Sequence, residues 1–316
     1  MILKIENTQL FHEYFHDWAQ LYKLEAVRPV TYRKYQMTFT RLAQLAPDLK
    51  ICDLNKRNYQ LLLNEYAKTH ERQTTMDFHH HLKAAILDAL DEGLLTRDPT
   101  RKVVIKGKTP NFVKNKFLNQ YELQALLGVL ELPEAPNWDW FILLTAKTGL
   151  RFSEALALTP KDFDFHRQRL SISKTWDYKN PKGGFADTKN PSSKRVLPID
   201  RQLSGQFSQL TKKMPPNQLI FVKKRVFNST VNDRLSALCR HAQIPKISIH
   251  CLRHTHASLL IFAGVSVGSI AKRLGHANVT TTQNTYLHII RELEDQDHDK
   301  IMQHLSLFDD SGGETP

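Results

Sequence analysis

Residues 249–254 read Ile-His-Cys-Leu-Arg-His, and this stretch decides how the second half of the chain is understood. In a helix, side chains three and four positions apart lie above one another, so the two histidines and the arginine share one face. Leu252 and Leu259 mark the opposite side, which we expect to be buried. The pattern therefore predicts a helix that projects His250 and Arg253 together.

Further motifs place the same residue types at intervals along the chain. They are Thr148-Gly149-Leu150-Arg151, Asp187-Thr188-Lys189-Asn190, Leu274-Gly275-His276 and Thr281-Thr282-x-x-x-Tyr286. An arginine offers a planar, permanently charged fork that matches phosphate oxygens. Arg151 follows a glycine turn at the entrance to a helix, whose amides also favour anions. Two arginines on one phosphate could hold both non-bridging oxygens as charge builds on them.

Tyr286 adds a nucleophile to these cationic groups. A phenol has a pKa near 10, so at neutral pH it needs neighbours that accept or stabilise its proton charge. Histidines, arginines and a lysine supply such neighbours. Together the motifs predict phosphoryl transfer through a covalent tyrosine, with cationic side chains in the place of metal ions.

The charge of the chain is unevenly distributed. The net charge is +12, and residues 111–290 hold 25 Lys and Arg against 11 Asp and Glu, a balance of +14. Residues 1–110 carry 17 against 13, and residues 291–316 carry 2 against 8. A body this basic is typical of polyanion binding, since each neutralised phosphate releases counterions. A merely soluble basic protein remains the alternative on charge alone.

Three widely spaced cysteines, Cys52, Cys239 and Cys251, indicate a reducing, cytosolic setting rather than a disulfide framework. Because no CxxC pair occurs, we expect buried free thiols rather than a metal site, and we expect no cofactor. We expect residues 79–81, three consecutive histidines, to be a solvated or DNA-facing stretch of helix. No apolar run reaches the ~18–20 residues that a bilayer span needs.

The first hundred residues show helical periodicity and no two-residue alternation. Apolar and aromatic residues recur at three and four positions over 10–22, 29–45, 53–66 and 73–90. Proline at the start of the second segment and Gly93 after the fourth are boundary signals. These residues are predicted to form a small all-helical domain, 1–104.

A basic segment separates this domain from the next. Residues 101–116 hold six lysines and arginines, a glycine and a proline, so we predict a linker at 105–116 that lies against phosphates; a plain solvated linker is the alternative. The second domain, 117–290, opens with a capping-box pattern and an apolar helix at 138–148. Strand-like runs follow at 170–173, 195–199 and 220–222, and helices return afterwards.

In order and context, these motifs resemble those of the tyrosine recombinases, the phage integrase family. The resemblance covers nearly the whole chain and is strong over 117–290. The hairpin around residues 189–198, whose shape is like K-x-x-S-x-R-x-x-P, resembles that of integrases of phages and integrative elements of low-GC Gram-positive bacteria. The fold that it implies is mainly α, with a small antiparallel β-sheet in an α+β catalytic domain and an all-α, SAM-like core-binding domain.

The resemblance also implies a role for each motif residue. Arg151 and Arg253 would bind the scissile phosphate, His250 would assist proton transfer, and His276 would hydrogen-bond the phosphate. Tyr286 would form a 3′-phosphotyrosyl link and leave a free 5′-hydroxyl. Lys189 would protonate the leaving 5′-oxygen, with Lys182 and Lys194 as rivals. Glu154 is expected to position the Arg151 helix.

The implied partner is double-stranded DNA carrying attachment-site core sequences, bound by a homo-tetramer in the cytoplasm. The acidic, apolar-striped tail 291–316 would dock on a neighbouring protomer or pack back on its own. An excisionase or a host DNA-bending protein is left open as a further partner. Many such integrases carry an additional N-terminal domain for arm sites, so either this element lacks arm sites or the chain is incomplete.

Three alternatives remain beside the integrase. A chromosome-dimer resolvase of the same family would use identical chemistry, although the long excursion at 174–188 favours the integrase. A type IB topoisomerase fits the Leu-Gly-His motif less well. A non-enzymatic helical DNA-binding regulator would explain the charge and the helices, but it would have no need of Tyr286 or of two matched arginines.

Overall fold

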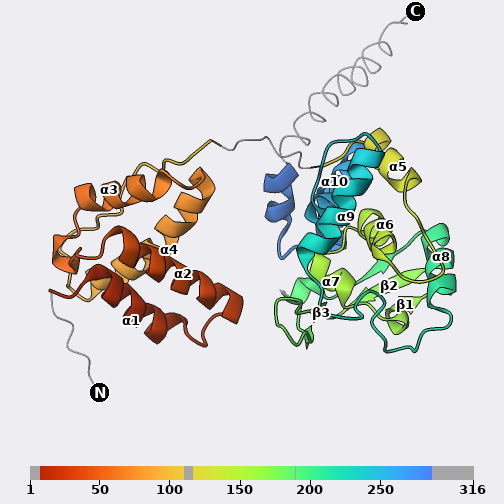
Figure 1. The fold of residues 1–316 in the computed structure, drawn as a ribbon, viewed down its shortest axis with the longest axis horizontal. Coiled ribbons are helices and arrows are strands. Elements are labelled where there is room, and N and C mark those ends of the chain that lie inside the picture. The colour runs from red at the N-terminus through yellow and green to blue at the C-terminus, as the bar shows by residue number, and fades with distance from the viewer. Residues whose placement is uncertain (1–7, 110–116, 189, 287–316) are drawn as a thin grey trace, which may run out of the picture. The chain divides into compact units, whose positions relative to one another are not determined.

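The computed structural model describes residues 8–109, 117–188 and 190–286. Contacts within the chain divide it into two compact units, Met1–Val113 and Lys114–Pro316 (Figure 1). The expected fold class is confirmed: the chain is mainly helical, with small antiparallel sheets in the second unit. Lys189, residues 110–116 of the predicted linker and the predicted tail 291–316 lie outside the described residues.

The first unit is an all-helical bundle, as its periodicity predicts. Its elements are α1 (Phe11–Lys23), α2 (Pro29–Leu45), the 3-10 turn η1 (Ile51–Asp53), α3 (Lys56–Ala67) and α4 (Arg72–Asp91). The third helix begins three residues later than the expected start at Asp53. The Asn55 side chain accepts hydrogen bonds from the backbone amides of Arg57 and Asn58, both at 3.0 Å, and thereby caps the helix at Lys56.

The histidines 79–81 do not form the solvated or DNA-facing stretch that we expected. His79 is buried, and its Nδ1 lies 2.8 Å from the hydroxyl oxygen of the buried Tyr59. His81 is half-buried and bonds the Thr38 hydroxyl at 2.9 Å; His80 alone is exposed. The partners Tyr59 and Thr38 lie on α3 and α2, which both pack against α4, so a helix that is polar in sequence turns two of its histidines inward.

The second unit combines helices with two small sheets. Its helices are α5 (Gln120–Gly128), α6 (Trp138–Thr148), α7 (Phe152–Leu156), α8 (Arg201–Thr211), α9 (Asn228–His241), α10 (Ile249–Phe262) and α11 (Val267–Leu274), with 3-10 turns η2 (Pro160–Asp162) and η3 (Pro191–Ser193). Its strands are β1 (Phe163–Asp164), β2 (Arg169–Ile172), β3 (Thr175–Trp176), β4 (Phe185–Ala186) and β5 (Arg195–Pro198). The predicted helix at 249–254 is thus the first part of α10.

The strands pair antiparallel in two groups. β1, β2 and β5 form one sheet in that order, and Leu170 on β2 lies opposite Leu197 on β5. β3 and β4 form a separate hairpin inside the excursion 174–188. The predicted strand at 220–222 is absent from the described sheets. Ile220 and Phe221 are buried in a loop instead, where the Ile220 amide donates to the Leu158 carbonyl at 3.0 Å.

Helix α6 lies in the middle of the core of the second unit. Phe141, Ile142 and Leu144 are 0% exposed, and α10 packs beside this helix. Gly149 ends α6 with a φ of +67°, and a Cβ there would lie 2.8 Å from the His256 ring, so glycine is needed at this turn. Arg151 follows this turn and is the residue directly before α7.

Two further findings concern cysteines and membranes. Of the expected buried thiols, Cys239 is buried, whereas Cys251 is half-buried and Cys52 is exposed. Among the described residues, no helix is both long enough and apolar enough to cross a bilayer.

Candidate active site

Three arginine side chains converge on the C-terminal end of α11. Each donates to one of three consecutive backbone carbonyls: Arg195 Nε to Arg273 O at 2.7 Å, Arg253 Nη2 to Leu274 O at 2.7 Å, and Arg151 Nη2 to Gly275 O at 2.9 Å. The last carbonyls of a helix lack intrahelical partners and carry partial negative charge. These carbonyls therefore bind guanidinium groups from three separate parts of the chain.

Gly275 makes this arrangement possible. Its φ is +67°, and an added Cβ would lie 2.9 Å from Arg195 Nη1 and 3.1 Å from the Ser193 Cα. Any side chain at this position would push Arg195 and the turn η3 away from the end of the helix. The same turn places His276 directly after the arginine-binding carbonyls.

The arginines share one buried carboxylate. Glu154, 1% exposed, accepts from Arg151 Nη1 at 2.7 Å through Oε1 and from Arg195 Nη2 at 3.0 Å through Oε2. Burial alone would raise the pKa of Glu154, but the two guanidinium groups bring it below its ordinary value. Glu154 also accepts from the Arg151 backbone amide at 3.0 Å and so fixes the start of α7, in line with the positioning role expected for it.

Arg253 is almost enclosed. It is 4% exposed, and its second contact is from Nη1 to the Gly149 carbonyl at 2.8 Å. Burial, together with the charge of Arg151, lowers the pKa of Arg253 to about 9, so the side chain stays charged at neutral pH. His250 is exposed where Arg253 is buried, yet the two side chains are close enough for the charge of Arg253 to lower the pKa of His250. The packing of α10 against α6 buries the arginine, whereas His250 lies in the first turn of the helix.

Two of the predicted histidines lie close to these arginines. Loss of hydration among the packed side chains, which acts on the His250 ring although that residue as a whole is exposed, followed by the charge of Arg253, lowers the pKa values of both rings, to about 4 for His276. The His276 Nδ1 also bonds the Thr282 hydroxyl at 2.7 Å. Both rings are therefore mainly neutral near pH 7 and can donate or accept hydrogen bonds without carrying charge.

Tyr286 lies on the helical residues 279–286, which follow α11. It is 3% exposed and packs in a small apolar cluster with residues of α10 and α11, among them Ile261 and Leu274. Burial raises the pKa of Tyr286 to about 12, an effect that the charge of Arg253 opposes. Its hydroxyl oxygen is 3.0 Å from the Nδ1 of His254. The phenol of Tyr286 therefore lies near Arg253 and His254.

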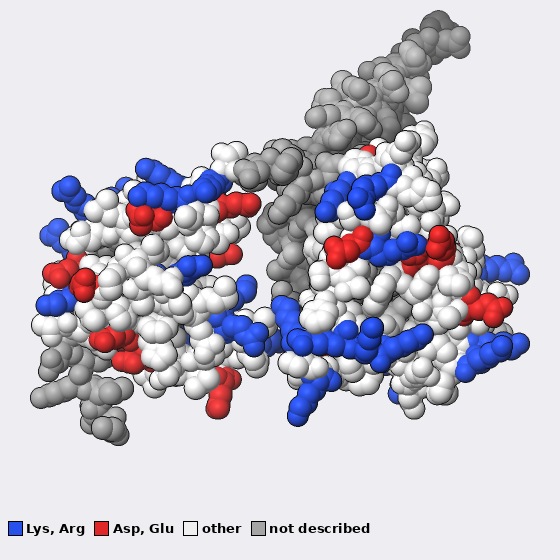
Figure 2. Space-filling view, viewed as in Figure 1, with Lys and Arg blue, Asp and Glu red and all other residues white. Residues whose placement is uncertain are grey.

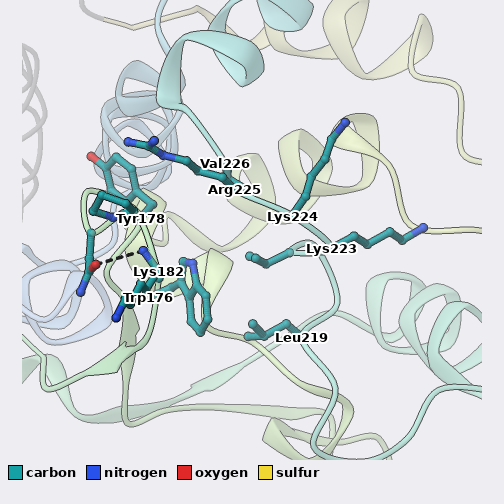
Figure 3. A pocket seen from close by; sticks show the side chains of 12 residues that line it. Trp176, Tyr178, Lys182, Leu219, Lys223, Lys224, Arg225 and Val226 are labelled. Carbon is teal, nitrogen blue, oxygen red and sulfur yellow. Dashed lines mark hydrogen bonds between the residues drawn. The ribbon is translucent and has the colours of Figure 1, made fainter.

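Lys189, the predicted proton donor, lies outside the described residues. Its rival Lys194 is 3.7 Å from the Asp187 carboxylate and largely exposed. The other rival, Lys182, belongs to the β3–β4 hairpin and lines a cavity of about 280 Å³ beside the segment 219–226 (Figure 3).

This cavity has a basic and aromatic wall. The Trp176 and Tyr178 rings stand on the hairpin side, and the run Lys223-Lys224-Arg225 forms the opposite side, with Lys223 and Lys224 pointing away from the hairpin (Figure 3). Figure 2 shows Lys and Arg side chains gathered in a band across one face of the second unit. Such a surface suits a phosphate backbone.

The structure adds residues to which the sequence had assigned no chemical role. His254 bonds the Tyr286 hydroxyl, and Arg195 shares the Glu154 carboxylate. Both residues lie within the quoted motifs: His254 directly follows Arg253, and Arg195 is the arginine of the hairpin pattern. Their positions in these motifs could have indicated a role in the site. In the described part of the chain, no three His, Cys, Asp or Glu side chains form a group that could hold a metal ion.

Comparison with known proteins gives consistent matches. A sequence model of the phage integrase family matches residues 116–292. The integrase of Staphylococcus phage L54a is 23% identical over 332 residues, covering 93% of this chain and 93% of its own length. The tyrosine recombinase XerC of Bacillus subtilis is 25% identical over 306 residues, covering 92% and 95%.

Solved structures show the same fold. The Tn1549 transposon integrase in complex with a circular intermediate DNA superposes with a TM-score of 0.76 at 18% identity, covering 91% of this chain and 99% of its own. A lambda integrase dimer bound to a core site has a TM-score of 0.67 at 15% identity, covering 86% and 76%.

Proposed function

The chain belongs to the phage integrase family and is a tyrosine-type site-specific DNA recombinase, and we propose that Tyr286 is its nucleophile. One observation carries this assignment: the buried Tyr286 lies close enough to Arg253 for the charge of Arg253 to act on the phenol, and Arg253 and Arg151 are held by consecutive carbonyls of one helix end. A phenol at the edge of a preformed guanidinium cluster is placed to attack a phosphate bound there.

The two arginines bind the non-bridging oxygens of the scissile phosphate. Their forks are already oriented by backbone carbonyls and by Glu154, so little reorganisation is needed as charge builds in the transition state. With its Nδ1 bonded to Thr282, His276 donates from Nε2 to a phosphate oxygen. His250, at the exposed start of α10, assists proton transfer around the nucleophile.

The reaction exchanges one phosphodiester for another. Tyr286 Oη forms a bond to phosphorus, the bond to the 5′-oxygen breaks, and Lys189 supplies a proton to that oxygen. The 3′-phosphotyrosyl link preserves the energy of the phosphodiester, so a 5′-hydroxyl can reverse the step and rejoin the strand without ATP.

Double-stranded DNA is the substrate. The balance of +14 over residues 111–290 and the wall formed by Lys182 and residues 223–225 support contacts to its phosphates. The protein acts as a homo-tetramer on paired core sites, with the tail 291–316 exchanged between protomers. A lambda integrase tetramer bound to a Holliday junction shares the fold, with a TM-score of 0.64 at 16% identity.

Integration and excision of a mobile element is the biological role we assign. Similar proteins include the L54a phage integrase, the transposase of transposon Tn916 from Enterococcus faecalis and the ICEBs1 integrase of Bacillus subtilis. Resolution of chromosome dimers is the second candidate, which the 25% identity to XerC supports.

The test uses a nicked duplex with candidate core sites taken from the DNA that flanks the gene. Protein and duplex are incubated in EDTA, quenched with SDS and examined for a covalent adduct. We expect an adduct with the wild-type protein and none with Tyr286→Phe. Tyr121→Phe, at a residue 83% exposed on α5, is the matched control and should behave as wild type.

Two results would contradict the assignment. An adduct that persists in Tyr286→Phe would place the nucleophile elsewhere. Tight binding to the duplex without any adduct from the wild type would favour the non-enzymatic regulator.

A further inference from the structure

The contact between His254 and Tyr286 has a consequence for proton transfer. Given the proposed function, on which this inference rests, we propose that His254 is a catalytic residue that accepts the proton of the Tyr286 hydroxyl when the phenol attacks phosphorus. The Nδ1 of His254 is 3.0 Å from Tyr286 Oη, within the reach that a general base requires. The contact joins α10 to the helical residues 279–286, which are distant in sequence.

The surroundings of Tyr286 create the need for a base. At 3% exposure the hydroxyl has little access to water that could take its proton. Burial raises the pKa of Tyr286 to about 12, although Arg253 opposes the shift. Spontaneous ionisation at neutral pH is therefore rare, and a neutral imidazole at hydrogen-bond distance provides a route for the proton.

The other two histidines are less suited to this step. His276 uses Nδ1 to bond the Thr282 hydroxyl at 2.7 Å, and its pKa, lowered to about 4, makes it a weak base. The His250 ring packs edge-on against the His254 ring, with centroids 5.0 Å apart. The His250 ring thus contacts the His254 ring, whereas the imidazole of His254 makes the contact with the phenol.

The proton balance is closed within the site. In the proposed step, His254 takes the form that carries its proton on Nε2 and accepts at Nδ1 from the Tyr286 hydroxyl. As Oη bonds to phosphorus the proton passes to Nδ1, and the departing 5′-oxygen takes a separate proton from Lys189. In rejoining, the 5′-hydroxyl attacks phosphorus and gives its proton back to the neutral Lys189, Tyr286 Oη leaves, and the protonated His254 returns the proton to Oη.

Two substitutions separate proton transfer from hydrogen bonding. His254→Asn places an amide near the position of Nδ1, so it retains a hydrogen bond to the phenol but cannot accept a proton. His254→Ala removes both and leaves a space for added imidazole. We expect each variant to form the covalent adduct about 10²-fold more slowly at saturating DNA, the lower end of general-base effects. Rejoining should slow by a similar factor.

Chemical rescue and pH dependence identify the role. Imidazole added to the buffer should accelerate His254→Ala and should leave Tyr286→Phe inactive. The wild-type rate should level off with pH once the imidazole is neutral, whereas the His254→Ala rate should keep rising toward the ionisation of the phenol itself. Among the described residues, the charged or titratable groups around His254 include His250 and Arg253 on α10, His276 after α11, and Tyr286.

His241→Ala is the control, because His241 is exposed at the end of α9 in the same unit; it should cleave at the wild-type rate. A wild-type rate in His254→Asn would overturn the proposal, as would slow variants that imidazole does not rescue and whose pH profile matches the wild type. Failure of the proposed function is distinguishable, because the wild-type protein itself would then form no adduct.

Discussion

Buried polar groups are treated differently in the two units of the chain. In the helical first unit, Tyr59 and His79 form a neutral pair, with the hydroxyl 2.8 Å from the ring nitrogen. Burial lowers the pKa of His79 to about 4, which keeps the ring uncharged. In the second unit, Arg151 and Arg195 pair with the single carboxylate of Glu154, and Arg253 lies near enough for the charge of Glu154 to act on it. One unit thus buries neutral pairs, and the other buries an excess of positive charge.

The difference separates polar groups that serve the fold from polar groups that serve a ligand. In a neutral hydrogen-bonded pair, each buried polar group already has its partner, so neither group needs a ligand. An excess of buried positive charge is unfavourable without a counter-charge, and a bound phosphate would supply that charge. The helix-end carbonyls at 273–275 hold the arginines in place until then.

The largest expected effect comes from weakening the arginine cluster without removing its charge. Arg253→Lys keeps a positive charge but loses the fork that donates to both Gly149 O and Leu274 O. We expect adduct formation to fall by about 10²- to 10³-fold, as when one preorganised donor is lost. Single-turnover cleavage of the nicked duplex measures it.

Arg240→Lys, at an exposed position of α9, is the control for the arginine substitution. If Arg253→Lys cleaved as fast as this control, an organised guanidinium fork at 253 would not be needed. The buried positive charge of the second unit would then not be explained by phosphate binding.

The next effect concerns stability. Glu154→Gln removes the carboxylate that Arg151 and Arg195 share, and breaking a buried ion pair on one side costs about 3–5 kcal/mol. Denaturant unfolding of the variant against wild type measures this cost. Asp233→Asn, at an exposed position of α9, should change little. Equal stability of all three proteins would show that the carbonyls of α11 alone neutralise the cluster.

The stability difference should also depend on pH. The pKa of Glu154 is lowered in the folded protein, so its stabilising effect is present above the ordinary glutamate pKa of 4.5. That effect is lost as the pH falls through the lower folded value, because the carboxylate then takes up a proton. Melting temperatures of wild type and Glu154→Gln should therefore converge in acid; a gap that widens in acid would contradict the sign.

The smallest effect is expected in the first unit. Tyr59→Phe leaves the buried His79 nitrogen without its hydroxyl partner and should cost about 1–3 kcal/mol. The rate of adduct formation at saturating DNA should not change, because neither Tyr59 nor His79 is a residue of the proposed active site. A loss of cleavage comparable to that of Arg253→Lys would instead mean that the neutral pair also serves catalysis.

Local patterns predicted most of the helices. The segment 29–45 was bounded by proline and by its periodicity and coincides with α2, and the apolar run 138–148 coincides with α6. The strand prediction at 220–222 was wrong, because a short apolar run is equally suited to a buried loop. The histidines at 79–81 were misjudged because the burial of a polar side chain depends on a partner such as Tyr59, which periodicity does not identify.

Motif order predicted the residues of the candidate site better than it predicted their geometry. Arg151, His250, Arg253, His276 and Tyr286 are brought together around the end of α11, while Lys189 lies outside the described residues and its role stays a prediction. The exposure of His250 against the burial of Arg253 was not predictable, because helical phase alone does not say how deeply a face is packed.

The sequence by itself determined the helical periodicity, the basic charge of the second unit and the order of the residues that carry chemistry. Only the tertiary structure decided that three arginines share the carbonyls of one helix end, and that His254 rather than another histidine meets Tyr286. The reason is distance along the chain: Arg253 bonds a carbonyl 104 positions away, and Arg151 bonds one 124 positions away. Local preferences set each helix, but such contacts exist only once the helices have packed.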